Sequence, residues 1–169
     1  MELGIETRCQ HLADEYSTNK HYGAISFPIY QTATFAHPAV GESTGYDYSR
    51  LQNPTRERVE KVVASLENGI DALGFSSGMA AIATRMELFR PGDHLIVDAD
   101  LYGGSIRLFR NISEKNGIEF TDIETYKENI EDFITEKTRA VFIETPTNPM
   151  MNVTDIRELA KKDHLVVTE

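Results

Sequence analysis

Short apolar runs alternate with helical patterns along most of this chain, and that alternation limits the possible folds more than any other feature. Five runs have the length of a buried strand: residues 72–75, 94–97, 118–120, 140–143 and 164–167. Helical patterns lie between them, over residues 79–89, about 104–115, 126–135 and 154–162. The alternation predicts an α/β fold with a mostly parallel sheet and helices on both of its faces.

Two of the predicted helices carry clear start signals. In NPTRERVEKVVASLE (53–67), Asn53 is a favourable N-cap and Pro54 suits the first helical position. Thr125 and Glu128 have the spacing of a capping box at the start of the helix predicted over residues 126–135. In the helix predicted over residues 53–67, one apolar face is expected to consist of Val59, Val62, Val63 and Leu66.

The first 52 residues show no sustained periodicity and contain scattered turn-forming residues. We therefore divide the chain into an N-terminal arm, residues 1–52, and an α/β domain, residues 53–169. A length of 169 residues corresponds to about one domain that can bury a sizeable core.

Charge and composition exclude several classes of function. The formal net charge is −10 and no basic stripe offsets it, which argues against a nucleic-acid partner. No apolar leader begins the chain, and no later run has the length of a membrane span. Cys9 is the single cysteine and cannot form an internal disulfide, so we expect a reducing compartment and a cytoplasmic protein. No metal site is predicted.

The turn Ser76-Ser77-Gly78 joins a predicted strand to a predicted helix. The first N–H groups of a helix lack partners within it, and together with the helix dipole they attract an anion. A serine N-cap with nothing bound would use the same residues. No Gly-x-Gly-x-x-Gly motif occurs, which disfavours a dinucleotide site.

Two more polar loops follow predicted strands, at Asp98–Gly104 and at Glu144–Pro149. In a parallel sheet, the carboxyl ends of the strands lie at one edge, where ligands bind. The three loops are therefore expected to converge on one ligand site.

The chain resembles the trans-sulfuration family of pyridoxal-phosphate enzymes, which act in cysteine and methionine metabolism. The resemblance rests on five ordered motifs: GAISFPIYQTATF (23–35), YDYSRLQNPT (46–55), SSGMAA (76–81), DLYGG (100–104) and ETPTNP (144–149). It implies the large domain of the aspartate-aminotransferase-like fold type I, here truncated and so incomplete. It also implies pyridoxal 5'-phosphate as cofactor, an amino-acid substrate, and a homo-oligomer (dimer or tetramer) with residues 1–52 at its interface.

The resemblance assigns four residues to the cofactor phosphate. Gly78 and Met79 would bind it through backbone N–H groups, in agreement with the anion preference of a helix start. Tyr48 and Arg50 would reach across a dimer interface to the phosphate of the neighbouring subunit. Arginine suits such a role because it donates bidentate hydrogen bonds to phosphate. Without the resemblance, Tyr48-Ser49-Arg50 would be interpreted as an exposed turn.

Two further residues are assigned to the cofactor ring and the substrate. Tyr102 would stack on the pyridine face, and its hydroxyl could assist proton movement as the catalytic group. Asn148 would lie near the ring hydroxyl and the substrate carboxylate. The alternatives are a core tyrosine at a strand end and a polar residue that closes a turn. Glu144 is treated as a supporting group.

The implied activity is β- or γ-elimination, or γ-replacement, on sulfur amino acids or O-acylhomoserine. Gly104 stands where methionine γ-lyases tend to carry a cysteine, which favours synthase or cystathionine-lyase types. The family's Schiff-base lysine lies in a Ser-x-Thr-Lys segment, and none occurs in the 169 residues. Glu169 falls near the position of the acid that holds the pyridine nitrogen, but it could equally be a frayed chain end. We therefore expect an N-terminal portion of such an enzyme, or else a non-catalytic chain that only associates with itself or a full-length homologue.

Overall fold

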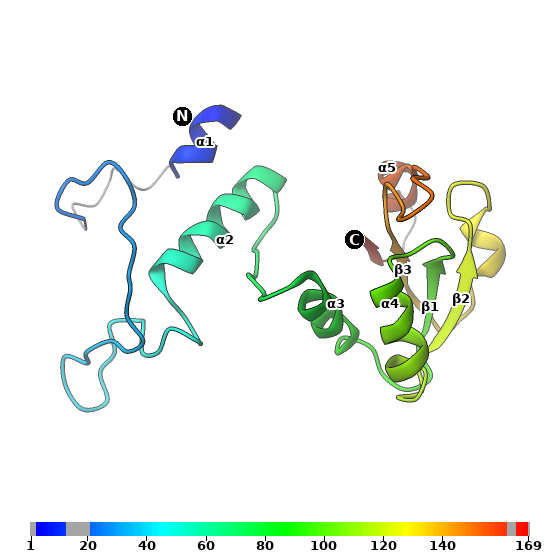
Figure 1. Ribbon diagram of the computed structural model, residues 1–169, viewed down its shortest axis with the longest axis horizontal. Coiled ribbons are helices and arrows are strands. Elements are labelled where there is room, and N and C mark those ends of the chain that lie inside the picture. The colour runs from blue at the N-terminus through cyan, green and yellow to red at the C-terminus, as the bar shows by residue number, and fades with distance from the viewer. Residues whose placement is uncertain (1–2, 13–20, 162–164, 169) are drawn as a thin grey trace. The chain divides into compact units, whose positions relative to one another are not determined.

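The computed structural model describes residues 3–12, 21–161 and 165–168. The chain forms two compact units, the N-terminal unit Met1–Gly74 and the C-terminal unit Phe75–Glu169 (Figure 1). Within the described residues, no helix is long and apolar enough to cross a membrane.

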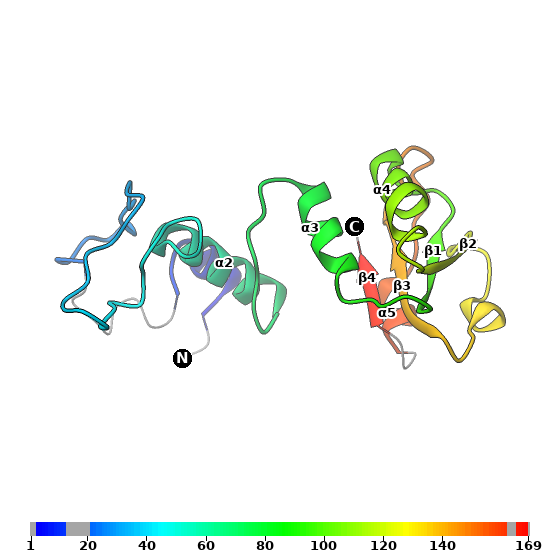
Figure 2. The same ribbon diagram turned by 90° about the horizontal axis from the view of Figure 1, so that it is seen from below.

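The C-terminal unit is built on a parallel sheet (Figure 2). Its strands are β1 (His94–Asp98), β2 (Glu119–Ile123), β3 (Thr138–Ile143) and β4 (Leu165–Thr168). Their order across the sheet is β2-β1-β3-β4, and each neighbouring pair is parallel. Four of the five predicted strands are therefore confirmed, together with the predicted sheet type.

Helices cover both faces of this sheet. They are α3 (Gly78–Met86), α4 (Gly103–Leu108) with its π-helical continuation η2 (Phe109–Ser113), the 3-10 helix η3 (Ile130–Phe133), and α5 (Ile156–Ala160). Buried side chains of α3 and η2 pack on one face, whereas those of η3 and α5 pack on the other. The prediction of helices on both faces is confirmed.

Alternation along the strands divides the core into two layers. Leu95 and Val97 of β1 belong to the cluster on the α3 face, and Ile96 between them belongs to the opposite cluster. On the α3 face, the Phe109 ring meets the Phe142 ring edge-on, with 5.1 Å between centroids. Each layer thus uses alternate residues of the same strands, as a sheet covered on both faces requires.

The predicted strand over residues 72–75 does not form, and this segment has no regular secondary structure. A strand needs a neighbour with which to exchange backbone hydrogen bonds. No described strand pairs with residues 72–75, and the side chains of Leu73 and Phe75 are exposed. An apolar run of strand length is therefore not sufficient here.

The predicted helix over residues 126–135 is also wrong, because only the short η3 forms there. Its expected capping box is not made: the Thr125 hydroxyl donates to Asp98 instead, and both side chains are buried. Glu128 accepts the backbone N–H of Glu124 at 2.7 Å, which closes a turn after β2. Tertiary hydrogen bonding has overridden the local helix signal.

The N-terminal unit contains α1 (Ile5–Gln10) and α2 (Pro54–Glu67). The start of α2 is as predicted, since the Asn53 side chain accepts the N–H of Thr55 at 2.9 Å and Pro54 is the first helical residue. The predicted apolar face is not a buried one, because Val59 is 59% exposed and Val63 is 45% exposed. Residues 21–52 form no helix or extended strand, which agrees with their irregular sequence, whereas the short helix α1 was not predicted within residues 1–52.

Candidate functional site

The strand order places a topological switch point between β1 and β3. From β1 the chain passes to β2 on one side, and then returns to β3 on the other side of β1. Ligands of doubly wound sheets bind where the strand order reverses, at the carboxyl ends of the strands. Two of the predicted polar loops, 98–104 and 144–149, leave the sheet at this point.

The third predicted loop leads into α3. The Ser77 hydroxyl accepts the N–H of Ala80 at 3.1 Å, so the serine N-cap is present. This cap leaves the N–H groups of Gly78 and Met79 without hydrogen bonds among the described residues. A Cβ at Gly78 would meet no atom within 4 Å, so the start of α3 is not crowded at this residue. The cap and an anion site are therefore compatible.

Met79 and Tyr102, predicted separately as cofactor ligands, lie together over Gly104. A Cβ built at Gly104 would clash with Cε1 of Tyr102 and would be 2.9 Å from Sδ of Met79. Only a residue without a side chain leaves room for both. The start of α3 and the loop after β1 thus share one small region.

Tyr102 is not a buried core residue, since 43% of it is exposed. Its backbone N–H donates to Oε2 of Glu144 at 2.6 Å, and Glu144 itself is buried. The expectation that Glu144 is a supporting group has a structural basis in this bond.

Two more hydrogen bonds join the same two loops in the opposite direction. Asp100, two residues before Tyr102, accepts the hydroxyl of Thr147 and the N–H of Met150, the latter at 3.1 Å. Thr147 is fully buried and closes its own loop, because its hydroxyl also accepts the N–H of Asn152 at 2.9 Å. Asn148 is exposed. The turn is therefore closed by Thr147, which leaves Asn148 accessible to a ligand.

A buried aspartate lies beneath these loops, and sequence reasoning assigned it no role. Asp98 is 1% exposed and accepts hydrogen bonds from the Thr125 hydroxyl and from the N–H of Asp100. Burial raises the pKa of the Asp98 carboxyl, and the Thr125 hydroxyl partly opposes that shift. Thr125 is linked in turn to Thr154 by a 2.8 Å hydroxyl contact. The one sequence signal was an aspartate directly after an apolar run.

Tyr48 and Arg50 belong to the N-terminal unit, whereas Gly78, Met79, Tyr102 and Asn148 belong to the C-terminal unit. The Arg50 guanidinium lies over the Tyr48 ring, 5.1 Å from its centroid. Tyr48 forms an antiparallel bridge with Thr34. The turn after it is braced by Arg56 of α2, whose Nη1 donates to the carbonyl of Ser49 at 3.2 Å. Both predicted side chains are exposed on an ordered turn.

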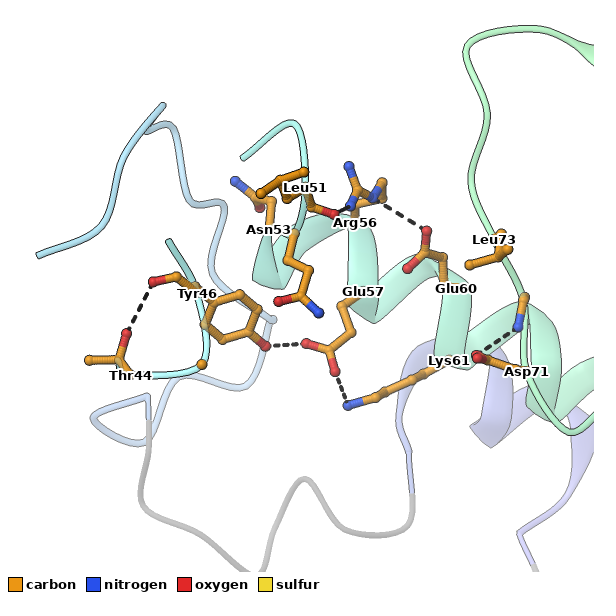
Figure 3. Close-up of a pocket in the computed structure, with 13 residues that line it drawn as sticks. Thr44, Tyr46, Leu51, Asn53, Arg56, Glu57, Glu60, Lys61, Asp71 and Leu73 are labelled. Carbon is orange, nitrogen blue, oxygen red and sulfur yellow. Dashed lines mark hydrogen bonds and ion pairs between the residues drawn. The ribbon is translucent and has the colours of Figure 1, made fainter. Parts of the chain in front are cut away.

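A groove of about 650 Å³ lies within the N-terminal unit, between residues 44–46, α2 and residues 71–73 (Figure 3). On its α2 wall, Glu57 accepts the hydroxyl of Tyr46 and pairs with Lys61. Burial, followed by the bond to Glu57, raises the pKa of Tyr46 to about 12. The sequence predicted no groove here, although the motif at 46–55 supplies part of its wall, because nothing local indicates that this motif lies opposite residues 71–73.

Ion pairs hold most of the described lysines. The pairs are Lys61–Glu57, Lys127–Glu124, Lys137–Glu119 and Lys161–Glu158. Lys127 stands in the turn that follows β2, at the carboxyl edge of the sheet. Lys20, Lys162 and Glu169 lie outside the described residues.

Comparisons with known proteins agree with the geometry. The family model for Cys/Met metabolism PLP-dependent enzymes matches residues 8–168. A cystathionine gamma-synthase/O-acetylhomoserine (thiol)-lyase from Bacillus subtilis is 46% identical over 167 residues, which is 97% of this chain and 44% of the relative. A cystathionine beta-lyase from Coxiella burnetii is 41% identical over 167 residues, 96% of this chain and 43% of the relative.

Solved structures show the same relationship. The crystal structure of a cystathionine gamma-lyase from Lactobacillus plantarum, complexed with L-serine, matches with a TM-score of 0.86 and 40% identity. The match covers 99% of this chain and 44% of that one, so the chain spans less than half the length of these relatives. The sheet of the C-terminal unit is thus part of the fold type I architecture of the cystathionine lyases and synthases. The chain belongs to the Cys/Met metabolism PLP-dependent enzymes.

Proposed function

We propose that this chain forms part of the cofactor site of a pyridoxal-phosphate-dependent trans-sulfuration enzyme. The observation that carries the proposal is the convergence of Met79 and Tyr102 on Gly104, next to the donor-rich start of α3. The whole enzyme would catalyse β- or γ-elimination, or γ-replacement, on sulfur amino acids or O-acylhomoserine. It would work in the cytoplasm.

The residues fit the chemistry of the cofactor. A phosphate dianion suits the N–H groups of Gly78 and Met79, which carry no hydrogen bond from the described residues. An aromatic ring suits the exposed face of Tyr102, which offers a flat apolar surface beside those donors. Asn148 would supply an amide that can both donate and accept at a ring hydroxyl or a carboxylate.

Each residue then has a separate task in the reaction. When bound, pyridoxal phosphate supplies an electron sink for the carbanion formed at the α-carbon of the substrate. Tyr102 would hold the ring plane, and its hydroxyl would accept or donate a proton at the substrate. Asn148 would orient the substrate carboxylate. The lysine that carries the cofactor would come from a segment beyond these 169 residues.

Tyr48 and Arg50 would act on a second copy of the chain. Their ordered, exposed turn supports a role in which Arg50 forms charge-assisted hydrogen bonds to the neighbouring subunit's cofactor phosphate. This part of the proposal requires a homo-oligomer.

A titration with two ligands tests the proposed site. The chain is titrated with pyridoxine 5'-phosphate, which has no aldehyde to react with surface lysines, and with pyridoxine, which lacks the phosphate. Gly78→Pro removes one N–H at a first helical position, where proline is tolerated. We expect it to weaken pyridoxine 5'-phosphate binding roughly ten- to hundredfold, the loss of one charge-assisted hydrogen bond, and to leave pyridoxine unaffected.

Ile156→Pro is the matched control, since it makes the same change at the first position of α5. Equal affinities of the native chain for the two ligands would contradict the phosphate site at α3. Binding of neither ligand would favour the alternative of a chain that only associates with itself or a homologue.

A further inference from the structure

Two carboxylates link the loops after β1 and β3 in opposite directions. Glu144, at the end of β3, accepts the backbone N–H of Tyr102 at 2.6 Å. Asp100, in the loop after β1, accepts the Thr147 hydroxyl and the Met150 N–H. Each loop thus contributes one acidic acceptor to the other, and the Tyr102 bond is partly buried.

We propose that Glu144 is a positioning residue that sets the orientation of the Tyr102 ring, with Asp100 holding the loop that follows Glu144. The proposal rests on the proposed function, because the ring matters as the surface on which the cofactor would stack. Glu144 acts through the Tyr102 backbone and need not touch the cofactor.

Few other contacts restrain the Tyr102 ring in the described structure. The residue is 43% exposed, so packing restrains it weakly. The Tyr102 side chain forms no cap at the start of α4, and the neighbours of its ring at this point are the backbone of Gly104 and the thioether of Met79. The backbone direction at Tyr102 therefore largely decides where the ring points. The Tyr102 carbonyl accepts the N–H groups of Ser105 and Ile106 at the start of α4, and the N–H bond to Glu144 holds the other side of the residue.

Glu144 is well suited to fix it. It directly follows the buried strand β3 and is 8% exposed, so its carboxylate has a defined position. A hydrogen bond to an ionised acceptor is stronger than one between neutral groups. Local changes to this acceptor should move Tyr102 more than they move the sheet.

The test compares the affinities of the full chain for pyridoxine 5'-phosphate and for inorganic phosphate. The ratio of the two dissociation constants measures the contribution of the ring alone. Glu144→Ala should lower this ring preference roughly three- to tenfold, as expected for a lost aromatic contact, with inorganic phosphate affinity unchanged. Glu144→Gln keeps a side-chain oxygen that can accept the N–H, and should restore most of the preference.

Glu128→Ala is the matched control, because Glu128 also accepts a backbone N–H, from Glu124, in a turn away from Tyr102. It should leave the ring preference unchanged. An unchanged ratio of dissociation constants in Glu144→Ala, or an equal loss of affinity for both ligands, would overturn the positioning role. If the native chain shows no ring preference at all, the proposed function fails instead.

A second measurement does not need the ligand. With 3-fluorotyrosine in the chain, the ¹⁹F signal of Tyr102 is identified by its loss in Tyr102→Phe. We expect Glu144→Ala to shift this signal, and Glu144→Gln and Glu128→Ala to leave it in place. If Glu144→Ala does not fold, hydrogen exchange at the Tyr102 backbone amide still tests the proposal. This amide must exchange slowly in the native chain and in Glu144→Gln, because in both its N–H is hydrogen-bonded to residue 144. Fast exchange in the native chain would overturn the proposal.

Discussion

The two units of this chain are stabilised by different kinds of contact. The C-terminal unit has an apolar layer on each face of its sheet, with strand residues such as Leu95 and Ile96 fully buried. In the N-terminal unit, Ala64 is the only buried apolar residue among those described, while Val59 and Val63 of α2 are exposed. Its order comes mainly from polar contacts such as Tyr46–Glu57–Lys61.

The difference shows what each part of the sequence can determine alone. Apolar burial provides most of the driving force for folding, and exposed ion pairs contribute little. The C-terminal unit can therefore hold its site loops on a core of its own. Substitutions at buried sites of the C-terminal unit should therefore cost more stability than substitutions at exposed sites elsewhere in the chain.

The largest effect is expected from emptying the core on the α3 face. Phe142 is 1% exposed and meets the Phe109 ring edge-on. Phe142→Ala should lower the free energy of unfolding by about 3–5 kcal/mol, because it removes buried apolar surface and leaves a cavity. Val63→Ala on the exposed side of α2 should change it by less than about 0.5 kcal/mol. Urea unfolding followed by circular dichroism measures both, and similar losses would contradict the contrast between the units.

A smaller loss of stability is expected when a buried hydrogen bond beneath the site loops is removed. Thr125→Val keeps the shape of the side chain but removes the hydroxyl that donates to the buried Asp98. Leaving a buried acceptor without this donor should cost about 1–3 kcal/mol. Thr84→Val is the control, since Thr84 is exposed on α3 and its hydroxyl bonds only within the helix. A neutral Thr125→Val would mean that Asp98 finds another donor.

How far the sequence predicts this fold depends on whether the signal is local. The strands β1 and β3 could be predicted because their runs are apolar enough to be buried on both faces. The run at 72–75 has the same local character, but strand formation requires a neighbour, which no periodicity can reveal. The helix signal at 126–135 fails for a related reason, because Thr125 is hydrogen-bonded to a residue 27 positions away.

The candidate site shows the same limit. The motif resemblance singled out Tyr102 and Met79, and the strand pattern placed their loops at one edge of the sheet. It could not reveal that both side chains meet over Gly104, or that Asp100 and Glu144 exchange partners across two loops. Those are pairings between separate segments, and their geometry exists only once the sheet has formed.

A pH-dependent effect is expected at the opposite end of the strands. His94 is 5% exposed, and its ring nitrogens contact the hydroxyls of Thr138 at 2.7 Å and Thr121 at 2.9 Å. Burial lowers the pKa of His94, an effect that Lys137 strengthens and Glu119 opposes. The folded state therefore prefers the neutral ring.

The sign follows from proton linkage. Above about pH 6.5, the ring is neutral in the folded and unfolded states, and its full contribution to stability is present. As pH falls below this value the unfolded chain binds the proton first, so stability declines until the folded ring also titrates. The slope cannot exceed about 1.4 kcal/mol per pH unit for one group. Unfolding curves measured between pH 7 and 5 should show that the free energy of unfolding falls more steeply with decreasing pH in the native chain than in His94→Gln. Equal slopes in the two proteins would contradict a titrating His94.

The smallest effect on stability is expected in the groove of the N-terminal unit, where the contact to be removed is an exposed ion pair. Glu57→Gln removes the charge beside Tyr46 and the partner of Lys61. The free energy of unfolding should change by less than about 1 kcal/mol, because water screens the attraction between exposed charges. The pKa of Tyr46, about 12 in the native chain, should fall but stay above 10, because burial is the larger cause of its shift and remains. Ultraviolet titration of tyrosinate, with Tyr46→Phe to isolate the signal, measures this; an unchanged pKa would leave burial as the sole cause.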